Sequence, residues 1–130
     1  MNRLADVSAR SDAASAVARD AAALHEAFLR RHTVAVAIAE GLGPEDERAA
    51  EWIRSCIGRA KHRSADRFTP GAPQTGIEQT ENDLTSALSV LPPESMGPYL
   101  RAEATDVGDR LEMARRFYND AVRDTRRLRE

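Results

Sequence analysis

The fold class is decided by the stretch Arg110-Leu-Glu-Met-Ala-Arg-Arg-Phe-Tyr-Asn-Asp-Ala-Val-Arg-Asp-Thr-Arg-Arg-Leu128, which carries an unbroken helical period. Apolar or small residues recur in it at alternating steps of three and four, namely Leu111, Ala114, Tyr118, Ala121, Thr125 and Leu128. This spacing places them on one stripe of an α-helix, while arginines and acids occupy the other faces. The stretch therefore predicts a long amphipathic helix with a coiled-coil-like seam.

The same period runs through the beginning of the chain, from Leu4 to Ile38, without an internal proline or glycine. It predicts a helix over about residues 2–40, which would be on the order of 58 Å long at 1.5 Å per residue. Gly41 and Gly43 follow, and glycine is favoured just past a helix end. The first and last helices are thus expected to be the long ones.

Two shorter helices are predicted between them. Pro44 suits a first helical position, and the acids after it complement the helix dipole, so a second helix is expected over about 44–67. Its apolar face is predicted to hold Ala49, Trp52, Ile53, Cys56, Ile57 and Ala60.

Thr75 and Glu78 match a capping box that starts a third helix, expected over about 76–91 and ended by Pro92-Pro93. A fourth helix is expected over 98–129. Strand-like alternation is missing from the sequence. We therefore predict a single all-α domain over residues 1–130, an antiparallel four-helix bundle with both chain ends at the same pole.

Composition narrows the function classes. The 130 residues are 42% hydrophobic and 31% charged but only 5% aromatic, and 19 basic against 21 acidic residues give a net charge of -2. No overall field attracts nucleic acid, so nucleic acid is not an expected partner. No run approaches the roughly 20 apolar residues of a membrane span, and the first residues lack a signal-peptide core. A chain without a membrane anchor is expected.

Few residues suggest chemistry. Cys56 is the only cysteine and has apolar neighbours, so we expect a buried, unreactive thiol. The Glu-x-x-His pairs of di-metal bundles are missing, since the residues three before His25, His32 and His62 are Ala22, Leu29 and Arg59. His25 and His32 are expected at the surface or at an interface. Nucleophile motifs and phosphate-binding glycine loops are missing too. We expect no catalytic residue, metal or cofactor.

The segment Ala114-Arg115-Arg116-Phe117-Tyr118-Asn119-Asp120-Ala121-Val122 resembles the signature near the end of the LemA family of bacterial proteins. Glu81-Asn-Asp-Leu-Thr-Ser-Ala-Leu88 is similar to the third-helix pattern of that family, and the long opening helix fits its first helix. The resemblance implies a bacterial helical bundle of unknown chemistry at the inner face of the cytoplasmic membrane. It departs from the family at Leu29–Val36, where the expected proline and asparagine are missing.

Arginines gather at the end of the fourth helix. Arg123, Arg126, Arg127 and Arg129 can pair with nearby acids in a solvated helix end, or can contact anionic lipid head groups as a membrane-apposed cluster. Arg116, Asn119 and Arg123 share one helix face and form a candidate partner-binding surface.

Two aromatic residues and one arginine also need an interpretation. Tyr118 lies on the seam with Phe117 beside it, which favours core packing for both. Arg31 also occupies a seam position, in the first helix, where it either pairs with a buried acid or extends its head to the bundle rim. The rim position is favoured.

The sequence as a whole favours a noncatalytic scaffold or protein-interaction module at or near a bacterial membrane. Two alternatives stay open: a small helical enzyme, and a soluble regulatory oligomer that associates through the exposed ends of its long helices. An apolar groove along the protruding end of the first helix would favour self-association.

Overall fold

The computed structural model describes residues 3–67 and 75–129, which form four α-helices and two short 3₁₀ turns. The helices are α1 (Arg3–Gly41), α2 (Glu47–Arg67), α3 (Thr75–Ser89) and α4 (Pro98–Arg129). Their bounds lie within three residues of those predicted. The described part of the chain contains no strand. The prediction of an all-α fold is confirmed.

The connections follow the proline and glycine signals. Helix α1 has no internal breaker and ends at Gly41, after which Pro44–Asp46 forms a 3₁₀ turn instead of the first turn of α2. Such turns are common where an α-helix begins. Pro93–Ser95 forms the second 3₁₀ turn, and Pro98 takes the first position of α4, where its missing N–H leaves no hydrogen bond unmade. The predicted threonine cap at Thr75 lies outside the described side chains.

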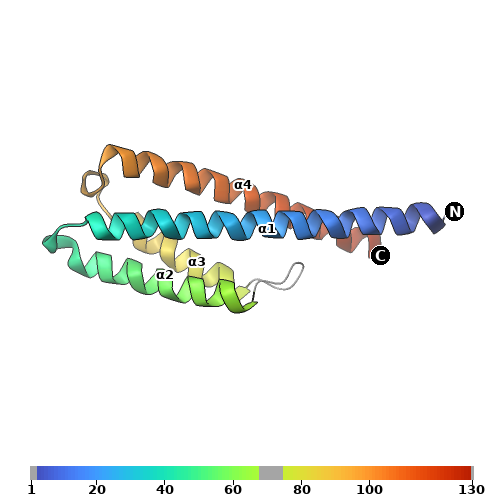
Figure 1. The fold of residues 1–130 in the computed structure, drawn as a ribbon, viewed down its shortest axis with the longest axis horizontal. Helices are drawn as coiled ribbons and strands as arrows, with labels where there is room; N and C mark the ends of the chain where they lie inside the picture. The colour runs from blue at the N-terminus through green and yellow to red at the C-terminus, as the bar shows by residue number, and fades with distance from the viewer. Residues whose placement is uncertain (1–2, 68–74, 130) are drawn as a thin grey trace.

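Helix α1 is the longest helix, and other helices pack along it; we call it the spine (Figure 1). Helix α4 runs antiparallel along most of it, and the α2–α3 hairpin lies beside its C-terminal half only. The N-terminus of α1 and the C-terminus of α4 meet at the same end, as predicted. The molecule is therefore a helical bundle at one end and a pair of helices at the other.

The core has two parts that match this division. One lies between α1, α2 and α3 around Ile38, Ile53 and Leu84, and the other joins α1 to α4 around Leu24, Phe28 and Leu111. Ile77, at the start of α3, also packs in the second part. Burial in both is complete at several of these side chains, so the bundle end has an ordinary helix-packed interior.

The buried face of α2 differs from the prediction. It contains Ala50, Ile53, Cys56, Ile57 and Ala60, whereas Trp52 is 42% exposed. Trp52 stands one residue, or about 100° of helix rotation, from Ile53. Because Ile53 and Ile57 lie in the core that α2 shares with α1 and α3, the indole is left at the edge of the packed face.

Candidate functional site

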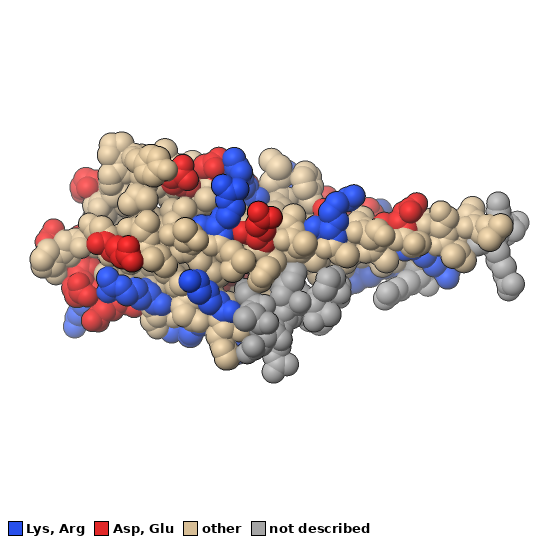
Figure 2. All heavy atoms as spheres, in the orientation of Figure 1, with Lys and Arg blue, Asp and Glu red and all other residues tan. Residues whose placement is uncertain are grey.

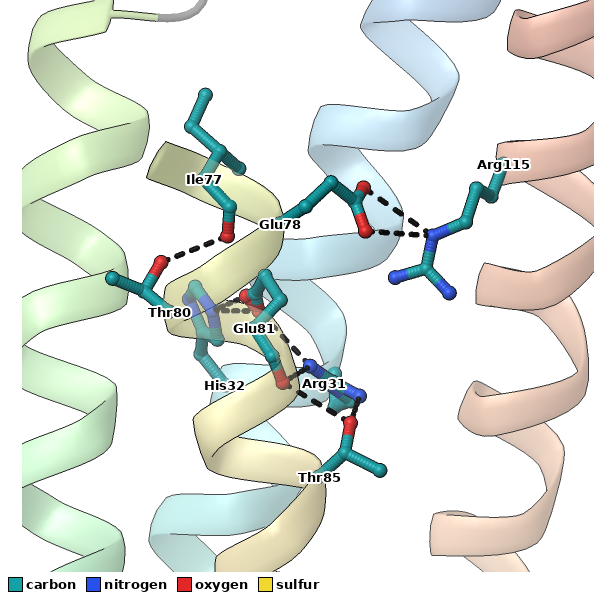
Figure 3. Close-up of polar contacts among 8 residues, drawn as sticks. All are labelled: Arg31, His32, Ile77, Glu78, Thr80, Glu81, Thr85 and Arg115. Carbon is teal, nitrogen blue, oxygen red and sulfur yellow. Dashed lines mark hydrogen bonds and ion pairs between the residues drawn. The ribbon is translucent and has the colours of Figure 1, made fainter. Parts of the chain in front are cut away.

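A buried polar cluster ties α1 to α3 (Figure 3). Glu81, on α3, has no exposed surface and accepts hydrogen bonds from two neighbouring residues of α1. Its Oε1 lies 3.2 Å from Nη2 of Arg31, and both of its carboxylate oxygens lie 2.8 Å from Nε2 of His32. One acid of α3 therefore holds two consecutive side chains of the spine.

Further hydrogen bonds fix the guanidinium of Arg31. Its Nη2 donates to the backbone carbonyl of Glu81 at 2.7 Å, and its Nη1 donates to the hydroxyl of Thr85 at 2.6 Å. Burial lowers the pKa of Arg31, while the charge of Glu81 and its hydrogen bond oppose that shift. Since the guanidinium stays protonated in proteins, the cluster pairs one buried positive charge with one buried negative charge.

The ring of His32 is completely buried in the same cluster. Its Nε2 lies 2.8 Å from both carboxylate oxygens of Glu81, and a carboxylate accepts a hydrogen bond from the histidine tautomer that has its proton on Nε2. Its Nδ1 has no hydrogen-bond partner in the described structure, and the same is true of Nε of Arg31. The cluster satisfies its charges but not all of its polar atoms.

This cluster is structural in character. Neither His32 nor Glu81 reaches the surface, and Arg31 is only 8% exposed. A general acid or base must come within hydrogen-bond distance of a substrate. Enclosed groups of this kind instead join two helices, because separating them would leave charges buried without partners.

A second polar contact links α3 to α4. Nε of Arg115 lies 3.1 Å and 3.3 Å from the two carboxylate oxygens of Glu78. The guanidinium carbon also stands 6.0 Å from the centre of the Phe28 ring, at the outer limit of a cation–π contact. Arg115 and Glu78 are both partly exposed, so this contact lies at the edge of the second core.

The surface is hollowed where only two helices remain. We call residues 4–20 of α1 and 117–128 of α4 the two-helix end. One groove in it, of about 380 Å³, has an apolar floor and four aspartates, and is lined by Asp12, Ala13, Ala16, Asp20, Phe117, Asp120, Ala121 and Asp124. A neighbouring groove of about 330 Å³ shares Ala13 and is lined by Arg10, Ala14, Thr125 and Leu128 as well.

Large apolar side chains are exposed at this end. Phe117 is 53% exposed in the floor of the first groove, and Leu128 is also exposed in the second. Leu4 and Val7, in the first turns of α1, are 80% and 62% exposed, and the N-terminal end of α1 projects past the end of α4 (Figure 1). Among the described side chains of the two-helix end, only Val17, Tyr118 and Ala121 are buried.

The structure separates the residues of the predicted signature. Tyr118 and Ala121 are buried against α1, as the seam predicts, and Ala114, Arg115 and Val122 are half-buried beside them. The prediction that Phe117 packs in the core is wrong. Phe117 stands one position before the seam residue Tyr118, which is about 100° of helix rotation, so its side chain faces solvent. Asn119 and Asp120 are exposed.

The predicted basic residues are at the surface. Arg116, Asn119 and Arg123 are all exposed on α4, and so is Arg126. Arg123 pairs with Asp120 at 3.3 Å and Arg127 with Asp124 at 3.8 Å, each within one turn of the same helix. This is the pattern of a solvated helix end. The side chain of Arg129 lies outside the described part.

Two expectations about α1 are wrong. Arg31 does not extend to the rim but pairs with Glu81, and His32 is in the core instead of at the surface. Glu81 was missed, although a signal existed: it stands between Ile77 and Leu84 at steps of four and three, which makes it a charged residue on an apolar stripe.

The described residues contain no group of three or more histidine, cysteine, aspartate or glutamate side chains placed to hold a metal ion. None of the described helices is both long enough and apolar enough to cross a bilayer.

Comparisons with known proteins give no family. No protein-family model, no curated protein and no solved structure matches this chain. The resemblance of Ala114–Val122 to the LemA signature finds no support in them and stays a prediction. The two-helix end and its grooves are therefore the candidate functional site.

Proposed function

We propose that this chain is a noncatalytic helical interaction module that binds an amphipathic helix along its two-helix end. One observation carries the proposal: the two adjoining grooves of this end have floors of alanine and exposed Phe117 and Leu128. A helix that presents apolar anchors at steps of three and four fits such a surface. The role agrees with the scaffold or protein-interaction module that the sequence as a whole favours.

The bundle end has a different part in this proposal. The Arg31–Glu81 pair and the core around Ile53 fix α2 and α3 against the C-terminal half of α1. This packing holds half of the spine rigidly and leaves the other half with one neighbour, α4. A rigid base supports a binding surface whose apolar side chains are already exposed, so binding requires little rearrangement.

A membrane-surface role has weaker support. Arg123 and Arg127 already have an acid within one helical turn, and aspartates line the adjoining groove. Those acids would repel the same anionic head groups that the arginines attract. Location at the inner face of a bacterial membrane therefore stays a prediction.

The test is photo-crosslinking inside the cell of origin. A photoreactive phenylalanine analogue replaces Phe117 in one sample and Tyr99, a 74% exposed residue at the far end of α4, in the control. We expect discrete adducts from position 117 and none from position 99. Equal adducts from both positions, or none from position 117, would overturn the proposal.

A further inference from the structure

The two-helix end leaves one side of a helical bundle uncovered. In its C-terminal half α1 packs against α2 and α4, but among the described helices only α4 runs beside its N-terminal half, and the first turns of α1 project past the end of α4 (Figure 1). The seam positions Leu4 and Val7 continue the stripe that is buried at Val17, Ala21 and Leu24, yet both are exposed. The apolar stripe of the spine is thus longer than the part of it that the described residues cover.

Charge at this end has both signs. Four aspartates line the larger groove, and three of them have an arginine beside them: Arg19 at 3.9 Å from Asp20, Arg123 at 3.3 Å from Asp120, and Arg127 at 3.8 Å from Asp124. These arginine side chains are at least 62% exposed. Exposed pairs of this kind contribute about 0–1 kcal/mol, so their members can change partners at little cost.

Figure 2 shows charges of both signs on the visible face, where separate acidic and basic side chains lie along α1. A surface with only acidic charge would call for a basic partner. A surface that carries both signs around an apolar floor is complementary to itself under twofold symmetry, because each copy offers both members of every pair. This charge pattern favours a second copy of the chain as the occupant.

We propose that the helix bound along the two-helix end belongs to a second copy of this chain. The two copies lie antiparallel and side by side through their two-helix ends, which together form a second four-helix bundle. This inference rests on the proposed function and names its partner. In this dimer, Phe117, Leu4 and Val7 of each copy pack against the other copy. Aspartate–arginine pairs within each chain are replaced by pairs between the two chains.

The available surface fits a small interface. At 1.5 Å per residue, residues 4–20 and 117–128 are about 25 and 18 Å long, so two helices about 10 Å wide present on the order of 430 Å². Standard interfaces bury about 800 Å² per partner, and smaller ones are typical of weak association, so we expect a dimer that forms only at high concentration. Charge also favours the antiparallel arrangement. In it, the arginine-rich last turn of α4 in one copy lies beside groove aspartates of the other copy, at the end of the groove that is nearer the bundle. In a parallel arrangement, the two arginine-rich ends would lie side by side.

Sedimentation equilibrium of the purified full chain over a wide concentration range tests the inference. We expect the mass to rise from one chain to two with concentration. Phe117→Glu should raise the dissociation constant at least about tenfold, which corresponds to 1.4 kcal/mol. The matched control is Tyr99→Glu, which puts the same charge on an exposed aromatic position of the same helix outside the interface. It should leave the constant unchanged.

Circular dichroism establishes that each variant is folded. If Phe117→Glu does not fold, Ala16→Glu replaces it as the test variant, because Ala16 lines the same groove. A wild-type chain that stays monomeric at every concentration overturns the second copy as partner. A dimer that Phe117→Glu and Ala16→Glu leave intact overturns the site. If crosslinks from position 117 then identify other proteins, the proposed interaction module is supported and the dimer is overturned. If position 117 gives no crosslink, both the interaction module and the dimer are overturned.

Discussion

At the scale of single residues, Glu81 decides most about the bundle end. It is the only carboxylate among the described residues that is completely buried. Two helices depend on it, because Arg31 and His32 come from α1 and the acid comes from α3. Buried ion pairs are costly to break from one side, since the remaining charge keeps its desolvation cost without its partner.

Glu81→Gln is therefore expected to lower the free energy of unfolding by about 3 kcal/mol or more. The amide keeps nearly the volume of the acid, so the loss reports charge and not a cavity. Urea unfolding followed by circular dichroism measures it. The matched control is Asp106→Asn, which removes the exposed pair with Arg110 and should change the free energy by less than about 1 kcal/mol. Similar losses in both variants would contradict the structural role of Glu81.

Cys56 shows how a chemically reactive residue becomes inert. It is completely buried, burial raises the pKa of its thiol, and a hydrogen bond from Nη2 of Arg59 at 3.4 Å only partly opposes this. The expectation of a buried, packed thiol is confirmed. Because the thiolate is the nucleophile, both burial and the raised pKa should protect Cys56.

Labelling of Cys56 by a thiol reagent at neutral pH should be at least about a hundredfold slower in the native chain than in urea, because the reagent must wait for an opening of the structure. The native state also holds the thiol proton more tightly than the unfolded state does. The free energy of unfolding should consequently fall as the pH rises above the ordinary thiol value. Equal labelling rates in the two states would refute the enclosed thiol.

At the scale of elements, helix length was set by where breakers stand. Gly41, Pro92 and Pro93 lie at or just after helix ends, and the long helices have no internal proline. Gly58 and Gly108 nevertheless stand in the middle of α2 and α4, and both are exposed with open space where a Cβ would stand. Each costs helix stability, because glycine loses more backbone entropy than alanine does on folding.

Gly58→Ala and Gly108→Ala should therefore each raise the free energy of unfolding by about 0.5–1 kcal/mol. Gly43→Ala is the control, since a Cβ there would approach Oε1 of Glu45 to 2.8 Å and no helix interior would gain. It should stabilise less than either helix substitution. Thermal and urea unfolding give the three values. A loss of stability on Gly108→Ala would show that α4 is not regular at this point.

At the scale of the whole molecule, the placement of α2 and α3 creates the candidate site. Because the hairpin covers only the C-terminal half of α1, the other half is left with α4 and with grooves on its sides. The arginines at that end are balanced by acids of the same end. The molecule therefore presents an apolar surface with mixed charge, and not a positive one.

This balance leads to an expectation about lipids. At physiological salt we expect the chain to sediment no more with anionic vesicles than with neutral ones. Polybasic segments gain about 1 kcal/mol per basic residue near an anionic surface, and aspartates beside the arginines offset that gain. The comparison variant carries glutamine at Arg123, Arg126, Arg127 and Arg129. Salt-sensitive binding to anionic vesicles that this variant loses would instead support a membrane-apposed end.

The sequence by itself determined the helices and their order. The steps of three and four from Leu4 to Ile38 and from Leu111 to Leu128, with glycine and proline between the helices, depend on local backbone preferences that act without knowledge of the fold. The seam also predicted the burial of Tyr118 and Ala121, because a stripe on a long helix has to face something.

Only the tertiary structure decided what faces what. Whether Arg31 reaches solvent, and whether His32 meets Glu81, depends on how α3 lies on α1. Contacts between residues about fifty positions apart in the sequence determine that packing. The exposure of the seam residues Leu4 and Val7 likewise depends on where the neighbouring helix stops. A helical period determines which side of a helix is apolar. The length of the partner helix determines how much of that side is covered. At the two-helix end, the uncovered part of the apolar side is the candidate site.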